Sequence, residues 1–452
     1  MSASSSSSTV AHSATGAFTP DAFAAHLATQ PSAPAWWLDR KRAAYESFAS
    51  LPMPKRTDEA WRFSSIATLT LADVQVGAGV PAGLSIESPF GPVALTFVNN
   101  TVVRSGERQR ADLPPGVLVT TLSDALANHS ELLRKHFMAQ PQKLGSEKFA
   151  ALHTAFIADG AFIHIPRGVE VAAPIVVVHA AAGANTAVFP HTLVIADDNS
   201  KATVIDYFVS LDSLSPLASG PSPAPQALAL ALGANDLYAA HGAHLTYVAA
   251  QAWSRDTLSF QLNSTVVRRD ARVQSLNLHL GARQARHESL SQLQAPGAFS
   301  EMLALTVADG TQEFDQRTLQ IHQAPNTKSD LLYKNALRDK ARTIFSGLIV
   351  VDPDAQKTDA YQSNRNLMLS DDAEANSLPG LEIQANDVRC THGATSSRID
   401  PEQEFYLRSR GISKAAADEL LTFGFFEEVL QRLESEPLHD ALRSLIQTQF
   451  QK

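Results

Sequence analysis

The chain has 452 residues, a mass of 48.6 kDa and a formal net charge of −9, and 44% of its residues are hydrophobic. This acidic balance argues against a protein that binds nucleic acid regardless of its sequence, because such proteins need a basic face. The single cysteine, Cys390, excludes an intramolecular disulfide and a structural zinc site made from several cysteines of one chain.

Residues 1–18 are rich in serine and carry neither a lysine nor an arginine. This composition predicts a disordered tail and does not resemble a secretory signal. No run of about eighteen apolar residues occurs, so we predict no transmembrane helix. With one cysteine and no export signal, we expect a reducing cytoplasm as the compartment.

Residues 19–68 are predicted to be helical. Thr19 is a suitable N-cap, because a proline and an acidic residue follow it. Pro34 is expected to open a second helix, in which Trp37 and Tyr45 lie near helical spacing. Residues 58–63 form a short helical or turn segment in this interpretation.

Residues 69–160 are interpreted as a mixed α/β lead-in, with a strand at 93–98 and a helix at 123–137. Short strands then dominate residues 161–399, starting with 161–165, 175–179, 192–195 and 202–209. Four prolines within residues 214–225 predict a surface excursion between two strands, because strand patterns resume on both sides.

Later strands are expected to start near Val273, His287, Ala298, Gln312, Ser329, Arg342, Thr358, Ala375 and Val388. This quasi-regular spacing fits either a β-sandwich or barrel, or a right-handed β-solenoid. Only two Asp-Gly pairs occur and no Asn-Gly pair, too few for about ten hairpins, which favours the solenoid.

Residues 400–452 return to helical patterns. Asp400 and Pro401 begin one helix, Gly411 is expected to end it, and Ser413 begins the next. Gly424 is expected to interrupt that second helix. A last amphipathic helix follows Pro437.

Cys390 and His392 are the strongest candidates for chemistry. On a strand, residues i and i+2 project from the same face, so a thiol and an imidazole would lie side by side. These donors suit zinc, copper or an Fe–S centre, but two ligands need others from elsewhere or from another subunit. The alternatives are a buried, inert cysteine beside a surface histidine, and a nucleophilic Cys–His dyad.

Other candidates carry less weight. His164, His179 and His191 lie in or beside apolar strands, where satisfied histidines are common. The acid pairs at 197–198 and 371–372 fall in turns, although spaced carboxylates on a β-solenoid would suit a glycosidase. No phosphate-binding loop or HExxH pattern occurs.

Residues 405–407 and 420–426 concentrate apolar side chains in the last helices. They would make either a small helical core of their own or a docking surface for a partner.

Several segments together resemble the SufB/SufD family of Fe–S cluster assembly scaffolds in the SUF system. They are DEAWRF (58–63), ALHTAF (151–156), DLLYKN (330–335), GLIV (347–350), CTHGAT (390–395), FYLRSRGI (405–412) and residues 417–425. In the SufB branch a glutamate usually follows the histidine, and further cysteines are expected. Here Gly393 follows His392 and Cys390 is alone, so the resemblance is to the SufD branch.

The resemblance implies a right-handed parallel β-helix between N- and C-terminal helical regions. It implies a non-catalytic scaffold that pairs with SufB through the β-helices and docks the ABC-type ATPase SufC, which hydrolyses ATP. Sulfur would arrive from a cysteine desulfurase system. Cys390 and His392 would be ligands of a transient Fe–S cluster shared with SufB.

By the same resemblance, the partner-binding residues belong to the C-terminal helices: Phe405, Tyr406, Arg410, Gly411, Leu420, Leu421, Phe423, Phe425 and Phe426. The cluster type, the electron donor, the binding of a reduced flavin to the complex and homodimer formation by the isolated chain stay open. A carbohydrate-active β-solenoid and a purely structural partner with an inert Cys390 are the alternative functions.

Overall fold

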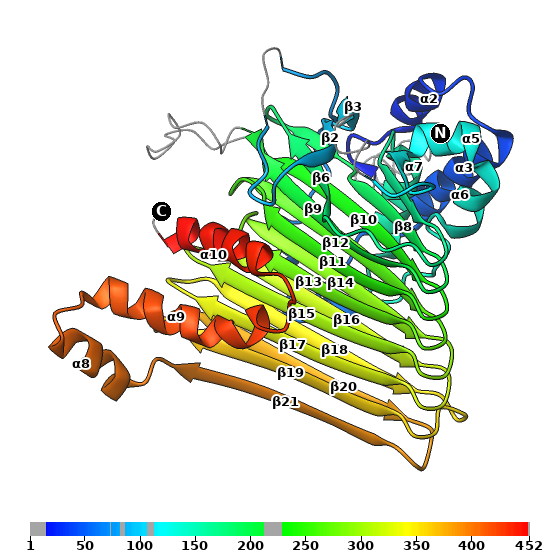
Figure 1. Cartoon of the computed structure of the whole chain (residues 1–452). Coiled ribbons are helices and arrows are strands. Elements are labelled where there is room, and N and C mark those ends of the chain that lie inside the picture. The colour runs from blue at the N-terminus through cyan, green and yellow to red at the C-terminus, as the bar shows by residue number, and fades with distance from the viewer. Residues whose placement is uncertain (1–14, 73, 82–85, 106–112, 212–227, 451–452) are drawn as a thin grey trace.

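The computed structural model describes residues 15–72, 74–81, 86–105, 113–211 and 228–450 (Figure 1). Most of the predicted serine-rich tail, residues 1–14, and the whole Pro-rich excursion, residues 214–225, lie outside these ranges.

The helices of the N-terminal region lie before and after the first four short strands and precede β5. Thr19 caps α2, since its Oγ1 accepts a hydrogen bond from the backbone N–H of Ala22 at 3.2 Å. The elements of this region are α2 (Pro20–Ala28), α3 (Ala35–Ser50), the 3-10 turns η1 (Glu59–Trp61) and η2 (Ile66–Thr68), α5 (Leu122–Asn128), α6 (Ser130–His136) and α7 (Glu147–Phe156).

The body of the molecule is a β-solenoid, because successive strands alternate between two sheets and pair in parallel with strands one coil away. From β10 and β11 onward, register partners lie 26 to 32 residues apart, as for Leu258 with Gln284 and Arg342 with Glu374. The predicted solenoid is therefore confirmed over the sandwich.

The first sheet has the order β20-β18-β16-β14-β12-β10-β8-β5-β4. Its strands are β4 (Leu118–Thr121), β5 (Ala161–Ile165), β8 (His191–Ala196), β10 (Ala229–Ala239), β12 (Thr257–Val267), β14 (Gln284–Leu293), β16 (Glu313–His322), β18 (Arg342–Val351) and β20 (Glu374–Ile383), with β1 (Gln75–Val76) and β7 (Thr186–Val188) beside this path.

The second sheet has the order β21-β19-β17-β15-β13-β11-β9-β6-β2-β3. Its strands are β2 (Val93–Val98), β3 (Thr101–Ser105), β6 (Ile175–Ala181), β9 (Lys201–Ser210), β11 (His244–Ala252), β13 (Arg272–His279), β15 (Phe299–Ala308), β17 (Lys328–Leu337), β19 (Asp359–Met368) and β21 (Arg389–Arg398).

One corner of each coil turns through a residue with positive φ. The series includes Asp270 (φ 54°), Gly297 (φ 78°), Asn326 (φ 59°) and Lys357 (φ 62°). Each donates its backbone N–H to the corner of the next coil, as Gly297 does to Asn326 O at 3.2 Å. Asp and Asn tolerate this conformation better than other side chains, so the corners need few glycines and no hairpin turns.

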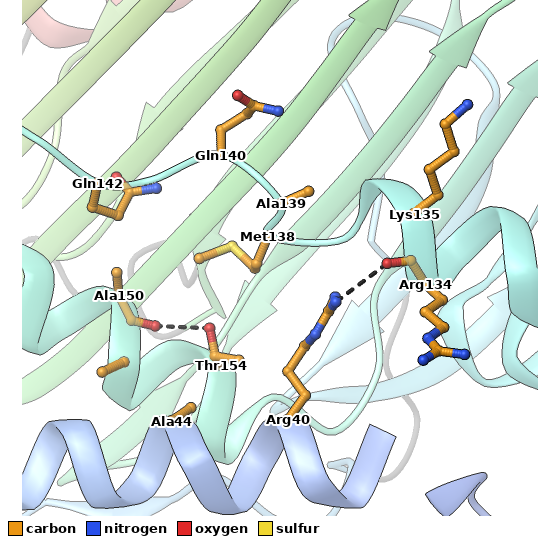
Figure 2. Close-up of a pocket in the computed structure, with 11 residues that line it drawn as sticks. Arg40, Ala44, Arg134, Lys135, Met138, Ala139, Gln140, Gln142, Ala150 and Thr154 are labelled. Carbon is orange, nitrogen blue, oxygen red and sulfur yellow. Dashed lines mark hydrogen bonds between the residues drawn. The ribbon is translucent and has the colours of Figure 1, made fainter. Parts of the chain in front are cut away.

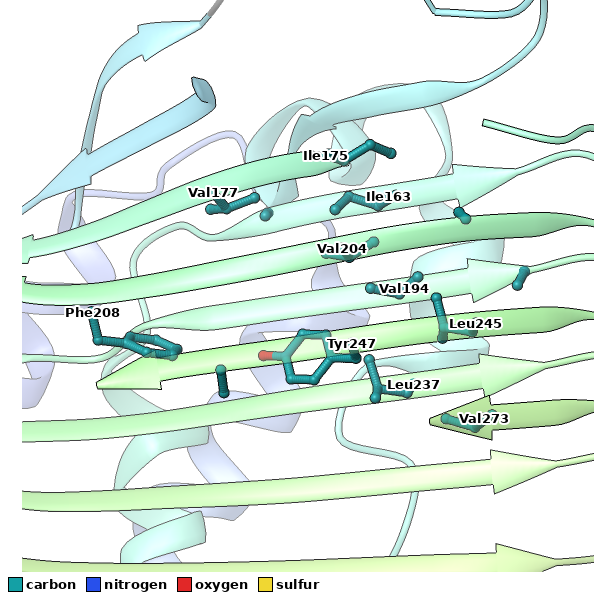
Figure 3. Close-up of a cluster of buried hydrophobic side chains, with 14 of the residues drawn as sticks. Ile163, Ile175, Val177, Val194, Val204, Phe208, Leu237, Leu245, Tyr247 and Val273 are labelled. Carbon is teal, nitrogen blue, oxygen red and sulfur yellow. The ribbon is translucent and has the colours of Figure 1, made fainter. Parts of the chain in front are cut away.

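The interior between the two sheets is mainly apolar in the early coils, where inward side chains from both sheets meet around a buried Asp206 that accepts hydrogen bonds from Thr192 and Tyr247 (Figure 3). Later coils carry amides instead. Gln316 Nε2 donates to Asn335 Oδ1 at 3.1 Å, and Asn335 Nδ2 donates to Asn366 Oδ1 at 2.8 Å. Asn366 Nδ2 reaches Ser396 Oγ at 3.3 Å, so a polar ladder extends to the last strand.

The two ends of the solenoid differ. At the first coils, β3 and β4 pair antiparallel with β2 and β5 and the N-terminal helices pack alongside. At the last coil, β20 and β21 each pair with a single strand among the described residues. Both are therefore edge strands with unpaired backbone groups on one side.

A buried ionic network fastens residues 58–68 to the outer face of the first sheet. Arg286 bonds Glu288 Oε1 at 2.7 Å and Asp315 Oδ2 at 2.5 Å, and its guanidinium lies 3.9 Å from the Trp61 ring centre. Burial alone would raise the pKa of Asp315, but Arg286 and Arg317 hold that pKa below its ordinary value. This network explains the DEAWRF segment as a structural anchor.

Three helices follow the solenoid: α8 (Pro401–Ser409), α9 (Lys414–Leu430) and α10 (Glu436–Phe450). Asp400 and Ser413 cap α8 and α9 as predicted, and Gly411 after α8 has φ 88°. The expected break at Gly424 was wrong: α9 continues through it, because packing of Phe426 outweighs the roughly 1 kcal/mol that a helical glycine costs. No described helix is both long and apolar enough to span a membrane.

Most of the expected strand starts match the structure within one residue, but β14 begins at Gln284 and not near His287. The residues before His287 are polar because they contact the N-terminal segment, so they lack a strand pattern. The helix expected at 123–137 is two helices, since His129 (φ −135°, ψ 33°) separates α5 from α6.

Replacing the buried Arg286 tests the anchor. Arg286→Leu leaves Glu288 and Asp315 without their buried cation, so we expect a loss of about 3–5 kcal/mol in unfolding free energy. The urea midpoint followed by circular dichroism measures it. Arg42→Ala is the control, because Arg42 pairs with Asp39 on the surface and such pairs contribute little. A midpoint for Arg286→Leu equal to that of the control would contradict the anchoring role.

Candidate functional site

Cys390 and His392 lie on β21, the last strand of the solenoid. In register, Cys390 is beside Ala360 and His392 is beside Gln362, both on β19. The two side chains share one face of the strand, with Cα atoms about 7 Å apart along the chain. The structure thus brings together the thiol and the imidazole that the sequence pairs.

This face of β21 continues the inward face of the coils beneath it. Ala360 packs with Ile349 and Val351 of the opposite sheet, and the half-buried Cys390 packs against that cluster. His392 also follows an inward position, but it is exposed because no further coil covers it. The pair therefore lies at the open mouth of the solenoid.

The thiol of Cys390 is held in its neutral form in the isolated chain. Burial is the main cause that raises its pKa above the ordinary value, a backbone hydrogen bond from Ala360 opposes this, and the Asp359 carboxylate adds to it. A thiolate ligand would need a compensating positive charge, such as a metal ion.

The described part of the chain contains no cluster of three or more His, Cys, Asp or Glu side chains able to hold a metal ion. Cys390 and His392 supply two donors. A mononuclear or cluster site at this place would take its remaining ligands from a partner, from inorganic sulfide or from solvent.

Gly393 lies on the opposite face of β21. A Cβ at this position would be 3.6 Å from the Tyr361 hydroxyl of β19, in ordinary contact, so the glycine does not relieve a clash inside the chain. Tyr361 on β19 and Ile383 on β20 are large side chains left exposed at this end of the molecule. The last coil therefore offers apolar surface as well as unpaired backbone groups.

The other candidate histidines lie elsewhere. His164 Nε2 is 2.8 Å from Asp197 Oδ2, His179 Nε2 is 3.3 Å from Thr192 Oγ1, and His191 Nδ1 is 3.1 Å from His153 Nε2. Burial lowers the pKa of His191 well below its ordinary value, so it is neutral. These contacts hold each ring within the fold, and only His191 Nε2 among the atoms of these three rings is buried without a hydrogen-bond partner.

The acid pairs are also separate from this site. Asp197 is occupied by His164, and Asp371 pairs with Arg398 at 2.6 Å. Each pair lies in a turn at a different coil, so the structure does not bring them together across a groove.

The C-terminal helices place the predicted docking residues in two groups. Phe405 (73% exposed), Tyr406 (57%) and Leu420 (52%) are open to solvent, and Arg410 lies 5.2 Å from the Tyr406 ring centre. A depression of about 500 Å³ beside them includes Tyr406 and Leu421. Arg410 and Gly411 are exposed, and Figure 1 shows α8 projecting beyond the sheets. Phe423, Phe425 and Phe426 instead pack toward the solenoid, and Phe426 is fully buried.

Charged residues fix the C-terminal half of α9 to the second sheet. Glu428 Oε2 is 2.6 Å from Lys334 Nζ on β17 and 2.9 Å from Arg365 Nη1 on β19. Arg432 Nη1 is 2.8 Å from Asp330 Oδ2. This contact is not predicted from the sequence, where its one signal is the charged residues at strand positions expected to face outward.

A hollow of about 450 Å³ lies far from Cys390, among α3, α6, α7 and the segment that joins α6 to α7 (Figure 2). Its Arg40 already donates to Phe137 O at 2.6 Å and to Arg134 O at 3.2 Å. The guanidinium therefore supports the chain around α6, and the hollow contains none of the predicted ligands.

Comparisons with known proteins match most of the chain. A family model described as the SufBD core domain of SUF-system FeS cluster assembly matches residues 178–425, and one for the SufBD N-terminal region matches 24–177. The iron-sulfur cluster assembly protein SufD of Bacillus subtilis is 28% identical over 92% of this chain and 94% of its own length. SufD of Escherichia coli is 30% identical over 85% of this chain and 86% of its own length. An iron-sulfur cluster assembly SufBD family protein of Synechocystis is 27% identical over 90% of both chains.

The raised pKa of Cys390 predicts its reactivity. As the only thiol of the chain, it should react with iodoacetamide with a pH midpoint above that of an unstructured cysteine peptide. Asp359→Asn should lower the midpoint by removing a nearby negative charge. Asp387→Asn, which alters a carboxylate paired with Lys357, serves as the control. A midpoint at or below that of the peptide would contradict this account of the thiol.

Proposed function

The chain belongs to the SufBD family of SUF-system Fe–S cluster assembly proteins, and from this premise we propose that it is a scaffold subunit that pairs with SufB and docks the ATPase SufC. In this proposal, Cys390 and His392 contribute ligands to an Fe–S cluster while it forms at the interface with SufB. The cluster is the cargo of the assembly and leaves it.

The bare last coil is the observation that carries this proposal. Its two edge strands present unpaired backbone groups, and an edge of this kind in a stable protein is normally covered or used for pairing. A second solenoid joined at these edges would bring its own side chains to the mouth where Cys390 and His392 lie. Two ligands from each side would then suffice for one cluster.

The exposed apolar residues of α8 and α9 support docking of a partner there. Phe405, Tyr406 and Leu420 form a surface apart from the solenoid, while the other half of α9 is fixed to the sheet. This division suits a helix pair that holds an ATPase subunit against the scaffold. We propose that SufC hydrolyses the ATP, so this chain itself is not an enzyme. ATP hydrolysis by the purified chain would contradict that assignment.

The alternatives have less support. A carbohydrate-active solenoid would need facing carboxylates, and the acid pairs here occupy separate turns. A purely structural partner with an inert Cys390 differs from the proposed scaffold only in that its thiol does not bind the cluster. A reducing cytoplasm would suit either form of the scaffold, since it keeps the thiol free. A reduced flavin and the cysteine desulfurase system would act through the assembled complex.

Replacing His392 tests the ligand role. In a complex of this chain with its own SufB and SufC partners, His392→Ala should abolish cluster formation while the three chains still co-purify. His244→Ala is the control, since His244 is an exposed histidine on β11, several coils away. Visible absorption after supplying iron and sulfide measures the yield. Cys390→Ser, measured alongside, separates a ligand thiol from an inert one. An unchanged yield with His392→Ala would exclude the imidazole as a ligand.

The docking surface has its own test. Phe405→Ala combined with Leu420→Ala should weaken SufC binding at least tenfold, because both side chains are exposed and apolar. Affinity is measured by calorimetry with purified SufC. Val103→Ala removes a comparable exposed side chain on β3, at the other end of the molecule, and should leave the affinity unchanged. Equal affinities for the two variants would place the ATPase elsewhere.

A further inference from the structure

Three buried polar side chains contact one another where the N-terminal helices meet the solenoid. His153 on α7 lies in the ALHTAF segment (151–156), to which the proposed cluster site gives no role. Its Nε2 is 3.1 Å from Nδ1 of His191 on β8, and His191 Nε2 is 3.5 Å from Oδ2 of Asp236 on β10. Each side chain is at most 2% exposed. These three residues, the buried relay, therefore join one helix to two strands of the first sheet.

The buried relay has more hydrogen positions than two neutral imidazole rings can fill. His153 Nδ1 is 2.8 Å from Leu232 O, and a carbonyl oxygen only accepts, so this nitrogen carries a hydrogen. A second hydrogen must lie between the two rings, and a third between His191 Nε2 and the Asp236 carboxyl. Two neutral rings supply two hydrogens. The third is therefore an additional proton.

The surroundings of Asp236 favour this additional proton on its carboxyl group. Without it, a carboxylate would face His191 Nε2, a nitrogen with no hydrogen-bond partner among the described residues. Burial raises the pKa of Asp236 to about 7, although the Met138 N–H, 2.6 Å from Oδ2, and the nearby Arg40 act to lower it. Burial lowers the pKa of His153 to about 4 and that of His191 well below its ordinary value. The rings are thus weaker bases than the carboxylate.

The other titratable groups around the buried relay leave this balance in place. Arg40 on α3 favours the carboxylate, but both of its terminal nitrogens already donate to backbone carbonyls. Lys41 on α3 and His179 on β6 disfavour a positive charge on the two rings, since they lower the pKa values of His153 and His191. Tyr238 on β10 is neutral, because burial and then Asp236 raise its pKa.

We propose that Asp236 keeps its proton in the folded protein and donates it toward His191, so that the buried relay is a proton-binding site that fastens α7 to β8 and β10. Asp236 also accepts the N–H of Met138, which has φ 44° at the start of the segment between α6 and α7. One carboxyl group thus holds both α7 and the segment before it. Loss of the proton leaves two acceptors facing each other and weakens this joint. The site acts apart from the proposed cluster chemistry.

Asp236→Asn tests the proton, because the amide offers an N–H to His191 and an oxygen to Met138, as the protonated carboxyl does. An unfolded aspartate has a pKa of about 3.9, below the value of about 7 in the folded chain. Between these values only the folded state holds the proton, so wild-type stability relative to the variant falls as the pH rises. We expect the ratio of wild-type to variant unfolding constants, measured with urea, to rise by up to about tenfold per pH unit. A ratio that is independent of pH would overturn the proposal.

Asp206→Asn is the matched control. Asp206 is as fully buried but accepts hydrogen bonds from the hydroxyls of Thr192 and Tyr247, so these contacts need no additional proton. Midway between the two pKa values, the infrared carbonyl band of a protonated carboxylic acid should be lost in Asp236→Asn and kept in Asp206→Asn. A spectrum without that loss in Asp236→Asn would contradict the proposal.

A measurement on the unaltered chain decides the matter if Asp236→Asn fails to fold. In ¹⁵N spectra of the histidine rings at the same pH, His191 should be a neutral ring that is protonated at Nδ1 and bare at Nε2. A ring protonated at Nε2, or at both nitrogens, would place the proton away from Asp236 and would rule out this assignment.

Discussion

The backbone ladder between successive coils is the constraint from which the rest of this structure follows. In a parallel solenoid every strand satisfies its N–H and C=O groups through the coils on either side, so only the two end coils lack hydrogen-bond partners for some of these groups. At the first coils, β3, β4 and the helices cover the strand edges. At the last coil, the outer edges of β20 and β21 stay unpaired among the described residues. The open end is also where its only cysteine lies.

The interior of the solenoid changes character toward that end. Apolar side chains dominate the early coils, whereas amides and hydroxyls from Gln316 to Ser396 connect the later ones. A hydrogen-bonded ladder fixes the spacing of the two sheets more specifically than apolar contacts do, since each amide needs a partner at a defined distance. The last coil is thus held in place from below, although no described residue pairs with its outer edges.

Much of the fold could be predicted from the sequence, because each coil repeats the same local pattern. Strand starts followed from apolar runs, and the helix caps at Thr19, Asp400 and Ser413 followed from side-chain chemistry. Prediction failed where distant contacts decide the outcome. Polar residues at the start of β14 belong to a strand only because residues 58–68 cover them, and Gly424 stays helical only because α9 packs on the sheet. Cys390 and His392 were identified from spacing, but the amide beneath them depends on a register that no local pattern reveals.

The last helices are attached to the solenoid at two places. Two residues connect β21 to α8, and α9 returns from α8 to the sheet, where Glu428 joins it to β17 and β19. Arg365, one of its partners, is in register with Thr395 of β21. A force applied to α8 is consequently transmitted both through the two-residue link to β21 and through the ion pairs of Glu428. Both connections lead to the neighbouring strands β19 and β21, so the rigidity of the Glu428 ion pairs governs how far a movement of α8 displaces the open end of the solenoid.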